Sequence, residues 1–399
     1  MKIKVSVILT LIFSCSLSLS ILMLLLNPLR LLFIFNTFSI FIAVNFFLLA
    51  CSFLLGIIFY RNIRVELIEV SMIILLLSLL IKSILVAHGY KLENVLLDFF
   101  KPTFFIVTVC VFRNLFNIRT LYNNKFIKLA PKLVMLVTIL MIVISVAINK
   151  FYMPIYPAYT IVESTLAFNA FNPIQNIMFS IWLFFGGKRG VFLAFFCMTI
   201  IYLILVSNPR KRSITFLLLF FLMVTLSFSF FDDIITIFFK VNSISAFEAM
   251  NFEEMFVQLG GGRVSEITSS LSYINSIQKM IFGCGLGFEY IVQDFGNESG
   301  MLHRNVHFSP VSIITIYGAL FATLFYIYII KYVIMAFKIM LINGYANIIY
   351  SVSFFFLCSV FFSFTEYVFF SYSNIPVAMG IIGILYKFRN SKGDRVCAG

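Results

Sequence analysis

The chain has 399 residues, of which 62% are hydrophobic and 11% are charged, and its mean hydropathy is +1.06. Soluble domains contain about 45–50% apolar and 25% charged residues. The composition therefore excludes a soluble globular enzyme, a disordered chain and a disulfide-rich secreted scaffold. Because the apolar runs are long and unbroken, they predict an all-α polytopic membrane protein rather than a barrel of short alternating strands.

The charge distribution argues against a nucleic-acid partner, although the net charge is +13. Residues 232–308 contain nine of the 16 acidic residues and only four basic ones, so this segment carries −5 and the rest of the chain carries +18. The basic residues outside the segment form short clusters between apolar runs, as the positive-inside rule expects. The split predicts a basic inner face and one large, acidic outer loop.

Taken in chain order, the apolar runs predict about 11–12 transmembrane helices in a single integral membrane domain spanning residues 1–399. A large periplasmic loop, residues 232–308, interrupts this domain between late helices. We interpret the first run as a retained helix rather than a signal peptide, because it is too long and lacks a clean cleavage site. The runs are 4–26, 31–59, 67–87, 96–112, 133–150, 172–186, 190–206, 213–231, 309–330, 346–365 and 368–386.

The number of crossings between two inner basic clusters leaves an open question. The clusters at 113–132 and 210–212 both favour the inner face, so an even number of crossings must separate them. Three apolar runs lie between them, and the middle one is short and ends at a glycine-rich turn. Either this run is re-entrant or residues 151–172 supply another crossing. If the middle run does not cross, Lys188 and Arg189 face outward.

Arg189 lies in the turn Gly187-Lys188-Arg189-Gly190 at the edge of the membrane. Glycines allow a close approach of a ligand to the backbone, and a guanidinium group binds phosphate or carboxylate with two parallel donors. An interfacial anchor explains a lone arginine equally well. Its outward placement, against the usual bias, makes an anion-binding role an equal alternative.

Residues 232–308, which we call the polar segment, contain a second arginine that also follows glycines. Arg263 follows three glycines, Gly260–Gly262, and begins a helix-like stretch that extends to Met280. A helix N-terminus with an arginine is suited to an anion. Glu266 lies on the same helical face, so a local ion pair with Arg263 is the alternative. The following Ile281–Phe288 stretch has three alternating glycines, which predict a tight, close-packed turn without a nucleotide-binding role.

Two of the three histidines lie at the end of the segment, in His303-Arg304-Asn305-Val306-His307. Histidine there accepts a proton, binds a phosphate oxygen or ligates a metal. No carboxylate or cysteine lies at ligand spacing on the same element, so we expect no metal. We interpret His303 as an interfacial side chain and His307 as functional.

Together these elements resemble the superfamily of O-antigen polymerases and O-antigen ligases of bacterial inner membranes. Arg189 in its glycine-flanked turn matches the family's Gly-x-Arg-Gly turn, Arg263 matches the loop arginine, and the glycine run at 281–288 is similar to the segment that follows it. Ligases have a histidine followed by Asn, Ser or Gln, then nine residues and a glycine. His307 is followed by Phe308, although Gly318 lies at the expected distance.

The resemblance covers about residues 130–330 and implies a metal-independent glycosyltransferase with no cofactor, acting at the periplasmic face. Its substrate would be an oligosaccharide linked to undecaprenyl diphosphate, and its other partners would be membrane lipids, a chain-length regulator and a flippase of the same pathway. Arg189 and Arg263, assisted by Lys188, would bind the diphosphate and stabilise its developing charge. His307 would be the general base, with Glu266 as the rival base.

Three alternatives to a polymerase remain open. A ligase would transfer the polymer to lipid A–core, but Phe308 departs from the ligase pattern. A flippase would need ionisable residues near the bilayer midplane, whereas Lys82 and Lys101 lie near the ends of their runs. An inactive scaffold predicts that Arg189, Arg263 and His307 do not converge in space.

Overall fold

The computed structural model describes residues 2–26, 37–85, 90–117, 263–292 and 302–342, together with isolated residues between 120 and 136 and between 353 and 370. Most of this part is helical. Its five long helices are α1 (Lys2–Leu26), α3 (Thr37–Ile58), α4 (Leu67–Leu85), α5 (Leu92–Leu115) and α17 (Ser309–Ile342). Each coincides with a predicted apolar run, and their existence is confirmed. The runs at 133–231 and 368–386 lie mainly or wholly outside the described residues.

Three of these helices are long and apolar enough to cross a membrane: Leu67–Leu85, Leu92–Leu115 and Ser309–Leu341. The described parts of α1 and α3 contain shorter apolar helices. A helical membrane protein is therefore supported, while the expected total of 11–12 crossings and the side on which residues 232–308 lie stay predictions.

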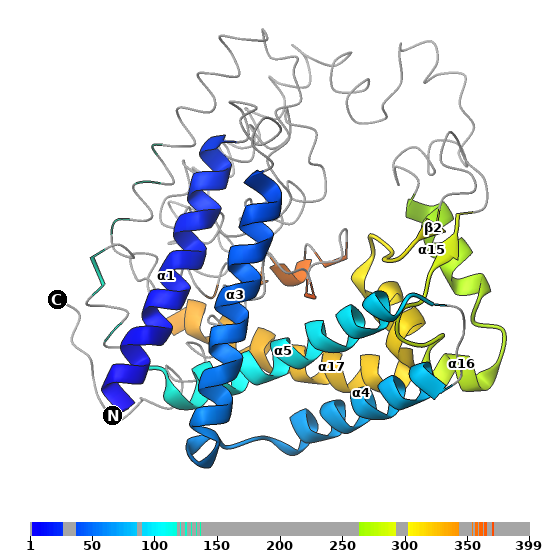
Figure 1. The fold of residues 1–399 in the computed structure, drawn as a ribbon, viewed down its shortest axis with the longest axis horizontal. Coiled ribbons are helices and arrows are strands. Elements are labelled where there is room, and N and C mark those ends of the chain that lie inside the picture. The colour runs from blue at the N-terminus through cyan, green and yellow to red at the C-terminus, as the bar shows by residue number, and fades with distance from the viewer. Residues whose placement is uncertain are drawn as a thin grey trace, which may run out of the picture.

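The spanning helices form a group in which α4 packs on both α5 and α17 (Figure 1). Helix α3 packs on α1 and on α5, and it thereby connects α1 to the group of spanning helices. Phenylalanine supplies much of the contact surface: Phe105 and Phe325 meet edge to face across α5 and α17, with ring centroids 5.6 Å apart. Large rings fill space between helices and gain from this offset geometry.

The polar segment folds against one end of this group, where α4 ends and α5 and α17 begin (Figure 1). We call this the segment end. The predicted single helix up to Met280 is two helices, α15 (Arg263–Ser272) and the short α16 (Ile277–Phe282). The break is explained by Ser276, whose side chain accepts the backbone N–H of Lys279 at 3.2 Å and caps a new helix. Two short antiparallel strands, β1 (Tyr290–Ile291) and β2 (Leu302–His303), complete the described segment.

The glycine run is a close-packed turn, as predicted, and it fits a break in α17. Gly283, Gly285 and Gly287 all have positive φ angles, and Gly318 has φ 86° inside α17. A Cβ added to Gly318 would lie 2.2 Å from the carbonyl oxygen of Ile281, so only glycine fits. The backbone N–H of Cys284 donates to the carbonyl of Thr315 at 2.7 Å, which satisfies an acceptor near the break.

Several ionisable side chains near the ends of the apolar runs are buried between helices. Helix α5 begins four residues before the predicted run and carries Asp98 and Lys101, which are 1% and 7% exposed. Glu69 in α4 is 0% exposed and Arg113 in α5 is 2% exposed. These residues lie near the ends of their apolar runs, so the prediction that little charge lies near the bilayer midplane stays a prediction. Hydropathy averages did not reveal that these charges are buried between helices.

Candidate functional site

The described residues of the polar segment contain a directly bonded acid and histidine. Glu266 on α15 and His307, two residues before α17, lie 41 positions apart in the sequence. Nδ1 of His307 lies 3.0 Å from Oε1 and 2.8 Å from Oε2 of Glu266, and the backbone N–H of His307 donates to Oε2 at 3.1 Å. These contacts fix the imidazole at its Nδ1 side and direct its Nε2 atom away from the carboxylate.

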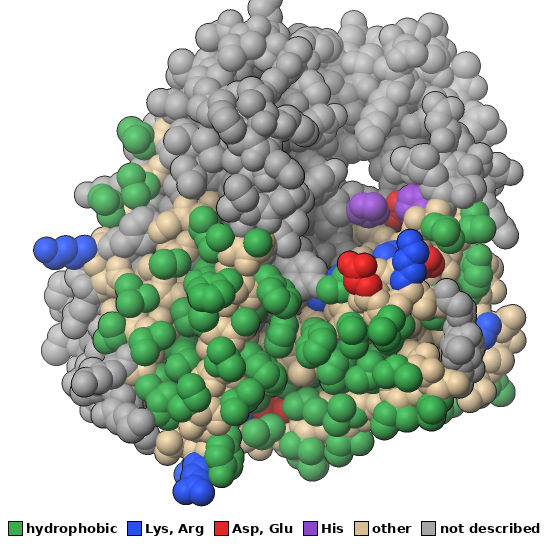
Figure 2. All heavy atoms as spheres, viewed as in Figure 1, with side chains coloured by type: hydrophobic (Ala, Val, Ile, Leu, Met, Phe, Trp, Pro, Cys, Tyr) green, Lys and Arg blue, Asp and Glu red, His purple; other side chains and the backbone are tan. Residues whose placement is uncertain are grey.

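The two members of this pair differ in exposure. The side chain of Glu266 is 11% exposed, whereas that of His307 is 46% exposed. Both described histidine side chains lie on the visible surface beside acidic and basic groups (Figure 2). The carboxylate is thus held inside the segment, while nearly half of the histidine side chain is exposed.

Burial and hydrogen bonding act in opposite directions on Glu266. Burial would raise the pKa of this carboxyl, but hydrogen bonds from His307, with the nearby charges of His307 and His303, hold the pKa below its ordinary value. Glu266 is therefore an anion at neutral pH. An anion at Nδ1 selects the tautomer in which Nδ1 carries the proton and Nε2 is the acceptor nitrogen.

Aromatic side chains of the segment pack behind the pair. Phe288 and Tyr290 are 1% and 0% exposed and stack with centroids 6.0 Å apart. The ring of Tyr290 lies 6.0 Å from that of His303. These rings form a small core that positions β2 and His307. Because Phe288 and Tyr290 are buried, they are not available to stack on a sugar.

A second contact fixes the segment to α5. Asp98 accepts the backbone N–H of Gly287 at 2.9 Å and binds Nη2 of Arg304 at 3.0 Å. Nη2 of Arg304 also donates to the carbonyl of Asn94 at 3.3 Å, and the side chain remains 25% exposed. The chain that leads to His307 is therefore held, three residues before the histidine, to a helix that is long and apolar enough to cross a membrane.

The predicted arginines are located only in part. Arg263 is the first residue of α15, as expected, so it lies less than one helical turn before Glu266; its side chain lies outside what the structure describes. Lys188 and Arg189 also lie outside the described residues, and their convergence with His307 stays a prediction. Glu266, predicted as a partner of Arg263 or as a rival base, is bonded to His307.

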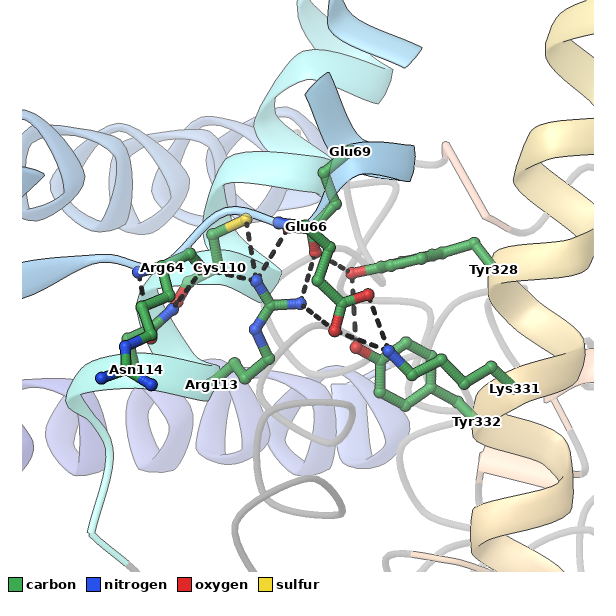
Figure 3. Close-up of polar contacts among 9 residues, drawn as sticks. All are labelled: Arg64, Glu66, Glu69, Cys110, Arg113, Asn114, Tyr328, Lys331 and Tyr332. Atoms are coloured by element: carbon green, nitrogen blue, oxygen red, sulfur yellow. Dashed lines mark hydrogen bonds and ion pairs between the residues drawn. The ribbon is translucent and has the colours of Figure 1, made fainter. Parts of the chain in front are cut away.

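A buried polar network lies at the opposite end of the helix group, which we call the network end (Figure 3). Arg113 donates from Nη1 to Oε1 of Glu69 at 2.7 Å and from Nη2 to Oε2 at 2.8 Å, as a two-pronged ion pair. Nη1 also lies 3.1 Å from Glu66, which accepts Nζ of Lys331 at 2.6 Å. Tyr328 donates to Glu69 at 2.6 Å.

The network ties α4, α5 and α17 together through side-chain contacts. Its two carboxylates face two cations, and Glu69, Arg113 and Tyr328 are at most 2% exposed. Sequence reasoning missed it, because Arg113 was interpreted as one of several inner-face basic residues. The only sequence signal was that Glu66 and Glu69 follow a basic pair, Arg61 and Arg64.

Among the residues that the structure describes, no three His, Cys, Asp or Glu side chains gather as metal ligands would. No protein-family model matches the chain, and a search of curated proteins finds no match.

Proposed function

We propose that the chain is an O-antigen polymerase. It would join oligosaccharide repeats carried on undecaprenyl diphosphate, at the periplasmic face of the bacterial inner membrane. The observation that carries this proposal is the Glu266–His307 pair, which lies in the polar segment directly before a membrane-spanning helix. In the proposal this pair supplies the general base, and its position before a helix that could cross a membrane suits a sugar presented on a lipid carrier.

In the proposed reaction, a hydroxyl oxygen of the acceptor sugar attacks the anomeric carbon of the donor sugar. The bond between that carbon and the diphosphate oxygen breaks, and the diphosphate leaves with the bonding electrons. The hydroxyl proton passes to Nε2 of His307. Glu266 stays ionised and stabilises the imidazolium that forms, which is the role of the acid in other acid–histidine pairs.

The departing diphosphate requires positive charge. Arg189, Arg263 and Lys188 fill this role in the proposal because of the family resemblance, and guanidinium groups suit phosphate oxygens. Arg304 adds a described cation on the same short stretch as His307. Asp98 engages only its Nη2 atom in the described contacts, and the side chain is partly exposed.

The direct test is complementation of a deletion strain, with lipopolysaccharide separated on a ladder gel. Loss of a polymerase leaves core bearing a single repeat, and the wild-type chain restores the ladder. At matched expression, His307→Ala and Arg189→Ala should fail to restore it. Full ladders from both variants would contradict the proposed mechanism.

The same gel separates the alternatives. Loss of a ligase leaves bare core while polymer accumulates on the lipid carrier. Loss of a flippase also leaves bare core, with single repeats retained inside the cell. An unchanged ladder in the deletion strain would exclude all three functions in O-antigen assembly.

A further inference from the structure

Helix α16 exposes an unusual amount of apolar surface for part of a polar segment. Ile277 is 75% exposed, Met280 is 50% exposed, and Ile281 and Phe282 are 37% and 39% exposed. Ile277, Met280 and Ile281 are spaced three and four apart, so they share one face of the helix. None of the six residues of α16 is buried. Contiguous exposed apolar patches typically mark a site of contact with a protein or a membrane.

Helix α16 lies next to α17, at the end of the helix group where α4 also ends. The helix packs on α17, and the turn that follows it lies in the break at Gly318. Leu320, two residues beyond the break, is 43% exposed, and Ile84 and Leu85 at the end of α4 are 54% and 76% exposed. Exposed apolar side chains of α16 and of two helices that are able to cross a membrane therefore lie at the same end of the helix group.

The glycine turn that follows α16 is bonded to the last residues of α4. The backbone N–H of Leu286 donates to Oγ of Ser83 at 3.0 Å, and a Cβ on Gly285 would meet the same oxygen at 3.3 Å. Lys82 directly precedes Ser83 on α4, and Lys279 on α16 is half-buried and donates from Nζ to the carbonyl of Tyr273 at 3.2 Å. Lysines beside an apolar face are typical of the boundary between acyl chains and phosphate headgroups.

We propose that α16 is an interfacial membrane helix. Its face formed by Ile277, Met280 and Ile281 inserts into the lipid leaflet at the segment end, with Lys82 and Lys279 at the level of the headgroups. The occupant of this face is the bilayer itself. The anchor holds the polar segment on the membrane surface, and it sets the depth of α15 and Glu266 through the short connection at Tyr273–Ser276.

The test uses tryptophan fluorescence of the full chain in phosphatidylcholine vesicles. Trp182 is the single tryptophan, so Trp182→Phe provides a background without one. Met280→Trp and, separately, Ile277→Trp then place the probe on the apolar face. Thr268→Trp on the exposed surface of α15 is the matched control. Lipids brominated near the carbonyl or near the middle of the acyl chain report depth, and aqueous iodide reports exposure to water.

We expect Met280→Trp and Ile277→Trp to be quenched by the shallow bromines and protected from iodide, which corresponds to insertion of about 5–10 Å below the headgroup boundary. Thr268→Trp should show the reverse. Iodide quenching of both α16 probes equal to that of the control would overturn the proposal. Protection from both quenchers would also overturn it, because a protein surface would then cover the helix.

Discussion

The two ends of the helix group use acids and bases in contrasting ways. At the network end, Glu69 and Arg113 are almost completely buried, and both form several polar contacts with neighbouring helices. At the segment end, Glu266 is buried but its partner His307 is nearly half exposed. A buried ion pair between helices is suited to holding those helices in one arrangement. A pair with one partly exposed member can bring its imidazole into contact with a reactant.

The largest effect expected from this comparison is on activity. His307→Gln should lower the polymerising rate by about 10²–10⁴-fold, because it removes the proposed general base. It should leave the stability of the folded chain nearly unchanged, since the side chain is 46% exposed. The rate is measured at matched amounts of purified protein, and stability by equilibrium unfolding in a denaturing detergent. A large loss of stability would place His307 with the structural residues instead.

Substitutions in the network around Arg113 should instead lower the stability of the folded chain. Arg113→Met leaves Glu69 buried without its cation, which typically costs about 3–5 kcal/mol in the free energy of unfolding. The triple variant Glu69→Met, Arg113→Met, Tyr328→Phe removes the charges together and should recover most of that loss. If Arg113→Met instead unfolds like the wild type, the network does not hold the helices together.

The break in α17 gives a smaller effect on stability. Gly318→Ala forces a side chain into the left-handed region at φ 86° and toward the carbonyl of Ile281, so a loss of about 1–3 kcal/mol or more is expected. Gly56→Ala in α3 is the control. There the added Cβ meets only the methyl groups of Val107 and Val111 at 3.1 Å. Equal stability of the two variants would show that the turn at Gly283 does not need the break.

The sequence predicted the helices better than their interactions. The described helices α1, α3, α4, α5 and α17 follow apolar runs, because burial in lipid selects such runs directly. The bond between Glu266 and His307 and the network around Arg113 join residues 41 and 44 positions apart, and no local pattern encodes those distances. Local spacing instead suggested Arg263 as the partner of Glu266. Similarly, Gly318 lay within an apolar run, and only its contact with the Gly283 turn explains the break.

The smallest expected effect is a change in the free energy of unfolding at acidic pH, caused by Glu266. The pKa of Glu266 is lower in the folded chain than in the unfolded chain, where it is about 4.3. The ionised pair therefore stabilises the folded state at neutral pH, and this contribution disappears as the pH falls below about 4 and through the folded pKa. The stability difference between wild type and Glu266→Gln should be about 1 kcal/mol or less and should shrink on acidification. Unfolding measured across this pH range checks the direction, and a growing difference would contradict it.

The most direct test of the central claim, that Glu266 and His307 act as one catalytic unit, is a double-mutant cycle on the transfer rate. Release of undecaprenyl diphosphate from lipid-linked repeats is measured for wild type, Glu266→Gln, His307→Gln and the double variant in vesicles. Groups that act as a unit are strongly non-additive. The double variant should therefore be no slower than His307→Gln alone, with Glu266→Gln slowed as well. Independent, multiplicative losses, or a wild-type rate for His307→Gln, would contradict the account.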